Sequence, residues 1–322
     1  MKAGERLGRD LSFGVCIGAP FVDGFPDLQK LLRDVEALEA LGYDALWVSD
    51  HVVTHTPVHD PFVLLSAFAA RTSRILLGTG VLLLPLRHPT LVAKALSVLD
   101  HLSGGRVVFG AGVGGEFREE FEACGVPVSE RGARANEALE VIGRLWTEER
   151  VTHRGRFYSF ENVNLDPRPL QPGGPSVWVG GRSDAALRRA AFYGRGWMSY
   201  LMTPERVAQG RDKLRDFALR AGKNPDGFAL SLLHFFCVDD SPKAARAMAV
   251  DNLTRTYRQP FEPLVDKYAS VGPPEAHVEF LRRYVEIGVR HFDLRPVCPP
   301  EDLVPQFRRI AEEVIPRLRS PG

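Results

Sequence analysis

Short apolar or β-branched runs alternate along this chain with longer amphipathic stretches. Eight runs of this kind occur, at residues 13–17, 45–49, 75–84, 107–111, 176–179, 196–200, 229–238 and 291–294. Apolar positions with helical spacing follow each run. This alternation is typical of repeated βα units around a parallel sheet. Eight units predict an α/β fold, a closed (β/α)₈ TIM barrel that occupies residues 1–322 as one domain.

Two segments exceed what a minimal barrel requires. Residues 151–175, after the fourth unit, combine several prolines and glycines with the aromatic cluster Phe157, Tyr158 and Phe160. We interpret this segment as an inserted hairpin and loop. Residues 255–274, near the C-terminus, are also rich in proline and form a second insertion. Long loops in compact domains are commonly functional, so both insertions are candidate lids.

Composition and charge narrow the classes of partner. The 322 residues include 41 Lys plus Arg and 40 Asp plus Glu, for a formal net charge of +1. No global field therefore favours nucleic acid or an anionic membrane. The charged N-terminal residues, and a longest apolar run of only residues 75–86, argue against export and membrane insertion. We expect a cytoplasmic protein that acts on a small molecule.

The four cysteines add to this interpretation. None of them shows CxxC spacing, which argues against both a disulfide framework and a zinc ribbon. A reducing cytoplasm is the compartment that fits unpaired cysteines.

Glycines follow the fifth predicted strand. Gly180, Gly181, Arg182 and Ser183 lead directly into a predicted helix. Glycine lets the backbone approach an anion, the helix amides favour negative charge, and arginine adds a charge-assisted contact. A phosphate site and a plain turn with a serine cap explain this segment about equally well.

A second glycine cluster follows the fourth strand. Gly110, Gly112 and Gly115 satisfy the G-x-G-x-x-G pattern of dinucleotide-binding units. That pattern requires an acidic residue at the end of the next strand about 20 residues on, whereas residues 130–150 continue as helix. We therefore interpret the glycines as a barrel-mouth loop that closely approaches a ligand, or as an ordinary turn.

The second predicted strand ends in Asp50 and His51. An imidazole at this edge is suited to general acid or base chemistry, and a neighbouring carboxylate can orient it or bind a ligand. The alternative is a helix-capping aspartate beside an inert loop histidine. His51, His55 and His59 recur at every fourth position, but the residues between them form a poor helix, so we expect no metal site.

The third strand is interrupted by glycine. Gly78 and Gly80 lie within an otherwise apolar run. Glycine inside a strand marks a bulge, a close approach to a ligand, or tight packing within the barrel. All three explanations remain open from this segment alone.

Taken together, these segments resemble the luciferase-like flavin and deazaflavin oxidoreductases, and most closely the subgroup that depends on the deazaflavin coenzyme F420. The matching pieces follow one another in order at residues 42–51, 77–89, 99–106, 110–114, 120–121, 131–132, 177–181, 194–197 and 288–294. The resemblance implies a barrel with the coenzyme ring lying across its C-terminal mouth. It also implies a homodimer that transfers hydride between F420 and a small organic substrate.

The resemblance assigns roles to particular residues. A bulge with a non-prolyl cis peptide is expected at Thr79, Gly80 and Val81, behind the ring. The coenzyme phosphate is expected at residues 180–183, and Gly112 forms part of the mouth. Asp50 and His51 would line the ring pocket, with His51 as the catalytic residue that stabilises or protonates the developing charge.

One position departs from the family pattern. Gly115 stands where the F420-dependent subgroup tends to have tryptophan, which leaves the substrate, and the choice of coenzyme, more open. The alternative is an FMN-dependent two-component monooxygenase supplied with reduced flavin by a separate reductase.

Basic residues near the expected barrel mouth bear on the choice of coenzyme. Deazaflavin carries an anionic tail, for which Arg87, His88, Arg118 and Arg182 are candidate contacts, although surface arginines are commonly just solvated. A non-catalytic barrel that acts as a sensor or carrier is a further hypothesis. A zinc hydrolase built on the histidine series is disfavoured.

Overall fold

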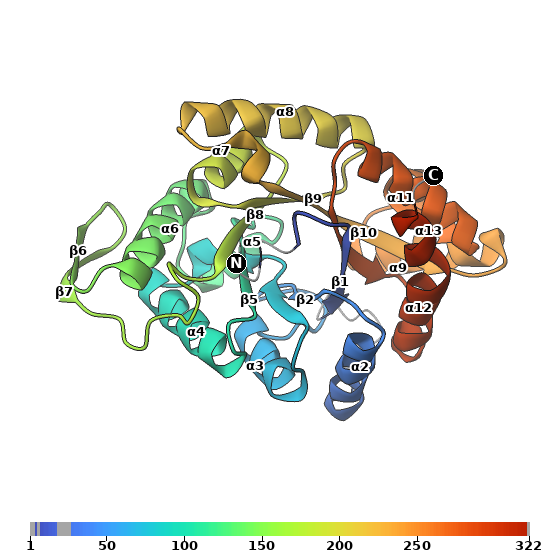
Figure 1. Cartoon of the computed structure of the whole chain (residues 1–322), viewed down its shortest axis with the longest axis horizontal. Coiled ribbons are helices and arrows are strands. Elements are labelled where there is room, and N and C mark those ends of the chain that lie inside the picture. The colour runs from blue at the N-terminus through green and yellow to red at the C-terminus, as the bar shows by residue number, and fades with distance from the viewer. Residues whose placement is uncertain (1–3, 5–6, 18–26, 321–322) are drawn as a thin grey trace.

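A closed barrel of parallel strands forms the centre of the molecule (Figure 1). The computed structural model describes residue 4, residues 7–17 and residues 27–320. The barrel strands are β1 (Ser12–Ile17), β2 (Ala45–Val48), β3 (Leu76–Thr79), β5 (Val107–Gly112), β8 (Ser176–Gly180), β9 (Gly196–Tyr200), β10 (Ala229–Val238) and β12 (His291–Pro296). Neighbours pair in parallel in this order, and β12 pairs with both β10 and β1, which closes the barrel. The predicted (β/α)₈ barrel and its eight strands are confirmed.

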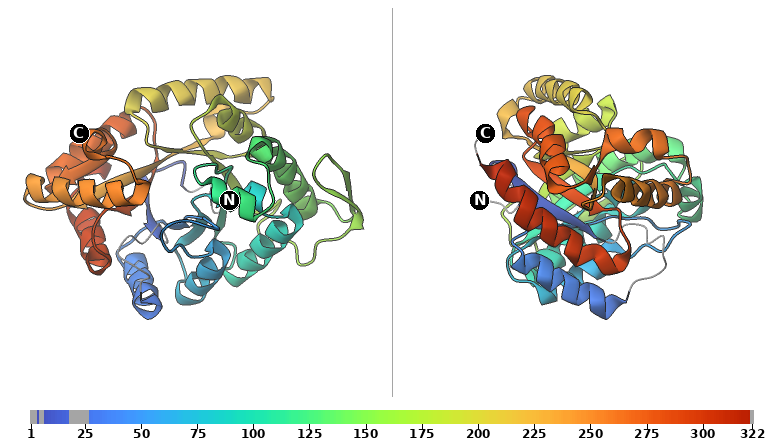
Figure 2. Two further views of the ribbon diagram at one scale, coloured as in Figure 1. Left: turned by 180° about the vertical axis from the view of Figure 1, so that it is seen from behind. Right: turned by 90° about the vertical axis from the view of Figure 1, so that its right-hand side faces the viewer.

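Helices surround the barrel on all sides (Figures 1 and 2). They are α2 (Leu28–Ala40), α3 (Pro61–Arg71), α4 (Pro89–Leu102), α5 (Arg118–Ala123), α6 (Arg131–Thr147), α7 (Asp184–Tyr193), α8 (Pro204–Arg220), α9 (Pro242–Tyr257), α10 (Val265–Tyr268), α11 (Pro274–Glu286), α12 (Leu303–Arg309) and α13 (Ile315–Arg319), with a π-helical turn at Ile310–Val314. Asp27 and Asp60 cap α2 and α3 by accepting backbone N–H groups. Across the described ranges, no helix is long and apolar enough to cross a membrane.

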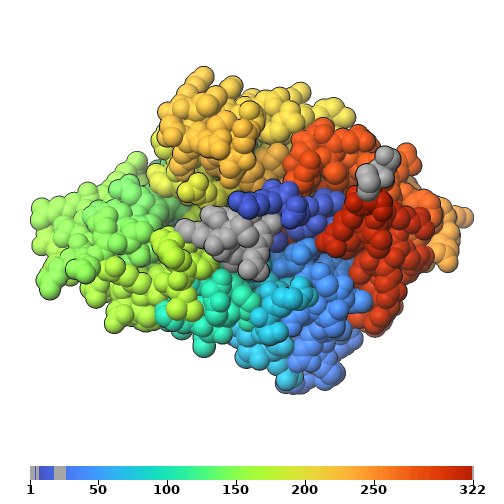
Figure 3. Space-filling model, in the orientation of Figure 1, coloured from blue at the N-terminus to red at the C-terminus, as the bar shows by residue number. Residues whose placement is uncertain are grey.

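The first insertion is a hairpin, as predicted. Strands β6 (Val151–Arg154) and β7 (Ser159–Val163) pair antiparallel outside the barrel. They project at the edge of the molecule beside α6 (Figures 1 and 3).

The second insertion is more ordered than a loop. Helix α9 continues to Tyr257. After α10, strand β11 (Ala269–Gly272) pairs in parallel with the C-terminal part of β10. Phe261, Val265 and Ala269 bury their side chains in a small separate core with Phe235. These spaced apolar residues hold the segment against the barrel.

Tryptophans fill the interior of the barrel on its N-terminal side. The rings of Trp47 and Trp178 lie 5.5 Å apart, and Trp47 Nε1 donates a hydrogen bond of 2.8 Å to His291 Nε2. A Cβ atom at Gly78 would lie 2.3 Å from the Trp47 ring, and one at Gly196 would lie 2.6 Å from the Trp178 ring. These glycines therefore make room for indole rings. Of the explanations offered for Gly78, tight packing within the barrel is the one that the structure supports.

Candidate active site

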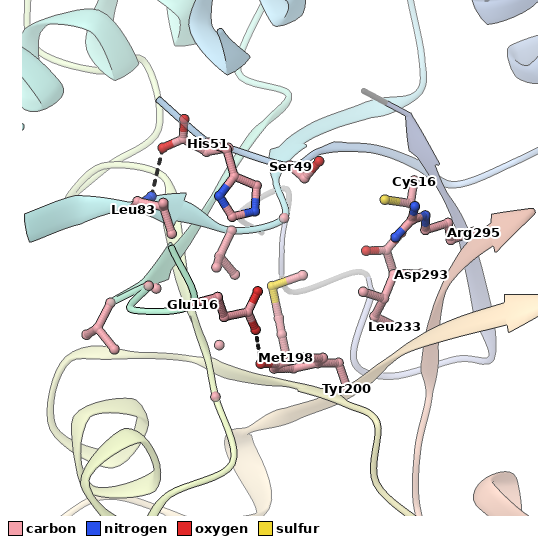
Figure 4. A pocket seen from close by; sticks show the side chains of 18 of the residues that line it. Cys16, Ser49, His51, Leu83, Glu116, Met198, Tyr200, Leu233, Asp293 and Arg295 are labelled. Atoms are coloured by element: carbon pink, nitrogen blue, oxygen red, sulfur yellow. Dashed lines mark hydrogen bonds between the residues drawn. The ribbon is translucent and has the colours of Figure 1, made fainter. Parts of the chain in front are cut away.

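A cavity of about 250 Å³ opens at the carboxyl ends of the barrel strands. Its wall includes residues that follow β2, β3, β5 and β8, and residues within β1, β9, β10 and β12. In Figure 4, His51 and Glu116 lie on one side of it, and Cys16, Asp293 and Arg295 lie on the other. In a TIM barrel this is the end at which active sites are built.

Most of the residues predicted from the sequence meet at this cavity. Seven of them line it: Asp50, His51, Gly80, Val81, Gly112, Gly180 and Gly181. Thr79 lies behind the wall, where its hydroxyl donates to the Gly110 carbonyl at 2.7 Å and accepts from the Gly110 amide at 3.0 Å. Thr79 therefore joins β3 to β5 and is fully buried.

The bulge in strand three is present. The Gly80–Val81 peptide bond is cis and non-prolyl, at the position that the family resemblance indicates. β3 stops at Thr79, and the chain resumes pairing with β5 only at β4 (Leu82–Leu83). Gly80 and Val81 consequently face the cavity instead of continuing the sheet.

Two of the predicted glycines serve the bulge. A Cβ atom at Gly112 would lie 2.2 Å from a Val81 methyl carbon, and one at Gly180 would lie 2.7 Å from the other. The sequence suggested that these glycines let backbone approach a ligand. In the structure it is the Val81 side chain that occupies the space, so both glycines position this apolar surface in the mouth.

His51 is oriented by a buried carboxylate. Its Nδ1 lies 3.3 Å from Glu120 Oε2, which also accepts the Val52 amide at 3.2 Å. Glu120 is fully buried on α5. An ionised carboxylate only accepts, so Nδ1 donates to Glu120 in that state, and Nε2 of a neutral ring is left as an acceptor for a ligand.

Asp50 is engaged by protein groups. Its carboxylate accepts two hydrogen bonds from Arg87, at 2.5 and 2.9 Å, and one from the Leu83 amide at 2.8 Å. Arg87 also pairs with Asp60 at 3.1 Å. Asp50 therefore fixes the segment after the bulge, and Arg87 is held by two carboxylates instead of being available for an anionic tail.

The segment after β8 combines a turn with a helix start. Gly181 has φ +132°, a conformation that side chains disfavour, and a Cβ there would lie 2.8 Å from Ala186. The Ser183 hydroxyl caps α7 by accepting from the Ala186 amide at 3.3 Å. The Arg182 guanidinium lies 4.7 Å from the centre of the Tyr200 ring. The serine cap that the sequence allowed is thus present beside the cavity.

The histidine series forms no metal site. Residues 51–59 contain no helix, so the three rings do not share a helical face. His51 and His55 instead pack edge-on against Phe117, with centroid separations of 5.0 and 5.4 Å. In the part of the chain that the structure describes, no group of three His, Cys, Asp or Glu side chains is placed to hold a metal ion.

Glu116 and Tyr200 were missed by the sequence analysis. The Tyr200 hydroxyl donates to Glu116 Oε1 at 2.8 Å across the mouth (Figure 4). Burial raises the pKa of Tyr200, and the adjacent Glu116 raises it further, so the phenol keeps its proton. Tyr200 ends a strand and Glu116 follows one, which is a positional signal that the sequence did contain.

The opposite wall was also missed. Asp293 and Arg295 alternate with Phe292 and Leu294 on β12, so both face into the barrel. This period-two polar pattern was visible in the sequence. Burial raises the pKa of the neighbouring Cys16 thiol, so Cys16 is a protonated, unreactive wall residue.

The departure at Gly115 has a backbone explanation. Gly115 has φ +111°, and a Cβ there would lie 3.0 Å from Arg131 Nε. A tryptophan would require a different path for this loop.

Comparison with known proteins gives a consistent set of similarities. A family model described as luciferase-like monooxygenase matches residues 12–291. An F420-dependent glucose-6-phosphate dehydrogenase of Beutenbergia cavernae is 32% identical over 331 residues, covering 91% of this chain and 94% of that protein.

Two solved structures show the same architecture. The monooxygenase RslO1 from Streptomyces bottropensis matches with a TM-score of 0.83 and 26% identity, over 95% of this chain and 99% of that one. An F420-dependent secondary alcohol dehydrogenase in complex with an F420-acetone adduct matches with a TM-score of 0.82 and 20% identity, over 97% and 100% of the two chains. At 20% identity, the second likeness concerns the fold alone.

Proposed function

This chain belongs to the luciferase-like monooxygenase family, and we propose that it is an oxidoreductase that transfers hydride between coenzyme F420 and a small organic substrate. The observation that carries the proposal is the 32% identity, over nine-tenths of the chain, to an F420-dependent glucose-6-phosphate dehydrogenase. The whole chain, residues 1–322, acts as one luciferase-like domain in this proposal.

The cavity fits a planar heteroaromatic coenzyme. Gly80, Val81 and Met198 supply an apolar surface, and polar groups stand at both ends of the cavity. Residues Gly180 to Ser183 hold the phosphate in this proposal, with Arg182 as the charged contact and the α7 N-terminus beside it.

The residues of the chain supply positioning, a proton site and protection from water. A bound deazaflavin supplies a ring carbon that accepts or delivers hydride. His51, with Nδ1 held by Glu120, accepts or returns the substrate hydroxyl proton at Nε2. Tyr200 and Glu116 bond to each other at the mouth, and the apolar part of the wall limits the contact of bulk water with the reacting groups in this proposal.

A second candidate is an FMN-dependent monooxygenase that receives reduced flavin from a separate reductase. The observation that favours it is the 26% identity, over 95% of this chain, to the monooxygenase RslO1. The same cavity would hold either coenzyme ring. Since Arg87 is held by Asp50 and Asp60, and Arg118 pairs with Glu122 on the surface, neither is a free contact for a deazaflavin tail.

Coenzyme titration tests the two candidates. Apoprotein is titrated with F420 and with FMN while coenzyme fluorescence is followed. We expect saturable binding of F420, and loss of F420 absorbance when glucose 6-phosphate or 2-propanol is added as hydride donor. Tight binding of FMN without a response to F420 would establish the second candidate instead, and binding without turnover of any donor would favour a carrier.

We further propose a cytoplasmic homodimer. The four free cysteines support the compartment, and the family resemblance supports the assembly. Light scattering on the purified protein tests the assembly, and a monomer at micromolar concentration would contradict it.

A further inference from the structure

Among the residues that the structure describes, Asp293 stands out as a buried carboxyl group without a partner. It is 1% exposed, and neither of its side-chain oxygen atoms makes a hydrogen bond to these residues. Arg295, two residues along β12, lies beyond ion-pair distance, bonds Thr256 at 3.4 Å and lies over the Phe235 ring at 5.3 Å. A charged carboxylate left in this state is very costly, so the group is neutral in the free protein.

The carboxyl group faces the cavity. Asp293 lines it, beside Cys16 and opposite His51 (Figure 4). A Cβ atom at Gly80 would lie 3.5 Å from Asp293 Oδ2, so the carboxyl is adjacent to the cis bulge. Burial raises the pKa of Asp293 well above its usual value, in keeping with a protonated acid at this position.

A neutral carboxyl group has a specific complement. It offers one O–H donor beside one carbonyl acceptor. The matching ligand edge carries an N–H beside a C=O, as an amide, lactam or imide does, and the two groups then exchange a pair of hydrogen bonds. The dioxopyrimidine ring common to deazaflavins and flavins has such an edge.

We propose that Asp293, as a neutral acid, binds the N–H and C=O edge of the coenzyme's dioxopyrimidine ring and so fixes how deeply the ring enters the barrel. The inference rests on the proposed coenzyme-dependent function, but it holds for F420 and FMN alike. Asp293 is a binding residue on the wall opposite His51, so the two polar walls divide the tasks of holding the ring and moving the proton.

Two substitutions separate this role from a structural one. The asparagine of Asp293→Asn retains a hydrogen-bond donor beside an acceptor. The leucine of Asp293→Leu is similar in size to aspartate but has neither a donor nor an acceptor. We expect the dissociation constant of F420, or of FMN where that is the coenzyme bound, to rise about tenfold or more in Asp293→Leu and to stay within about threefold in Asp293→Asn. Coenzyme that is methylated at the ring N–H should bind wild type about tenfold more weakly than the parent coenzyme does. Asp293→Leu should bind the methylated and the parent coenzyme equally well.

A stability measurement adds a readout without coenzyme. Removing an unpartnered buried carboxyl should raise the apoprotein Tm of Asp293→Leu by about 2 °C or more. Ser97→Ala is the matched control, because Ser97 is a fully buried side chain on α4 whose hydroxyl also has no partner among the described residues but lies outside the cavity. It should leave coenzyme affinity unchanged.

The outcomes are decisive. Equal affinity of wild type and Asp293→Leu, with normal binding by wild type, overturns the inference and leaves the proposed function standing. An Asp293→Asn defect as large as that of Asp293→Leu overturns the neutral-acid pairing. Failure of wild type to bind either F420 or FMN overturns the proposed function, and the inference with it.

Discussion

At the scale of single residues, His51 depends on a partner that is distant in the sequence. Glu120 lies 3.3 Å from His51 Nδ1, and His51 lines the cavity, so the protein holds this loop histidine in the orientation that our proposed proton transfer requires. The sequence left open whether His51 is inert or catalytic. A measurement of turnover decides between these two roles.

We expect His51→Ala to lower kcat by about 100-fold or more, since positioned general bases contribute this much. The dissociation constant of F420 should change by less than about threefold, because the ring is held elsewhere. Steady-state kinetics and fluorescence titration measure the two quantities. His55→Ala is the control: His55 also packs on Phe117 but lies outside the cavity lining. Normal turnover in His51→Ala would remove His51 from the mechanism.

The contact between Val81 and Gly180 is a second feature at this scale. We expect Gly180→Ala to lower the free energy of unfolding by about 1–3 kcal/mol, because its Cβ would lie 2.7 Å from a Val81 methyl carbon. Adding Val81→Ala should restore at least half of the loss. Urea denaturation measures both.

Gly143→Ala serves as the control for that experiment. A Cβ at Gly143 on helix α6 meets nothing within 4 Å in the described part of the chain, so this change should be neutral or slightly stabilising. Equal stability of wild type and Gly180→Ala would show that the bulge yields to the added methyl group.

At the scale of elements, the ends of β2 and β4 are joined through Asp50. Its carboxylate is fully buried and binds both the Leu83 amide and Arg87, so the segment after the bulge is anchored to the neighbouring strand. The sequence assigned Asp50 to the ring pocket. The structure leaves it at the wall but engages its oxygen atoms within the protein.

We expect Asp50→Asn to lower the free energy of unfolding by about 2–3 kcal/mol, because it breaks the ion pair between the buried Asp50 and Arg87. This value is below that of a fully buried ion pair because the Arg87 side chain is 18% exposed. Asp60→Asn should cost less than about 0.5 kcal/mol, since that partner of Arg87 is 45% exposed and asparagine still caps α3. Thermal or urea unfolding compares them. Similar losses for the two variants would contradict this difference.

At the scale of the whole molecule, three buried histidines set a pH dependence. Burial lowers the pKa of His234 and His291 to about 3 and that of His277 to about 4. In the unfolded chain these groups bind protons below about pH 6.5, whereas the folded protein does not until pH 4 or lower. Their contribution to stability is therefore complete above pH 6.5 and is lost as pH falls toward 4. Asp293, with a raised pKa, acts in the opposite sense.

We expect the loss of unfolding free energy between pH 7 and pH 5 to be about 2 kcal/mol smaller in His277→Gln than in wild type, since one proton-binding group of the unfolded state is removed. Urea denaturation at both values measures this difference. An identical pH dependence in the two proteins would show that His277 is protonated, or accessible, in the folded state.

The sequence by itself determined the elements and their order. Strand and helix periods depend on neighbours along the chain, so the eight βα units, the hairpin at residues 151–175 and the gathering of strand-end residues at one mouth were all predictable. The family resemblance placed the cis bulge at Gly80 and Val81.

Only the tertiary structure decided what those residues do. Closing the barrel brings Val81 against Gly112 and Gly180, Glu120 against His51, and Arg87 against Asp50. It also leaves Asp293 without a partner among the described residues around the cavity. Such pairings depend on side chains that meet across strands and loops distant in the chain. A linear pattern specifies which face a residue takes, but the neighbour it finds there is set by the closed barrel.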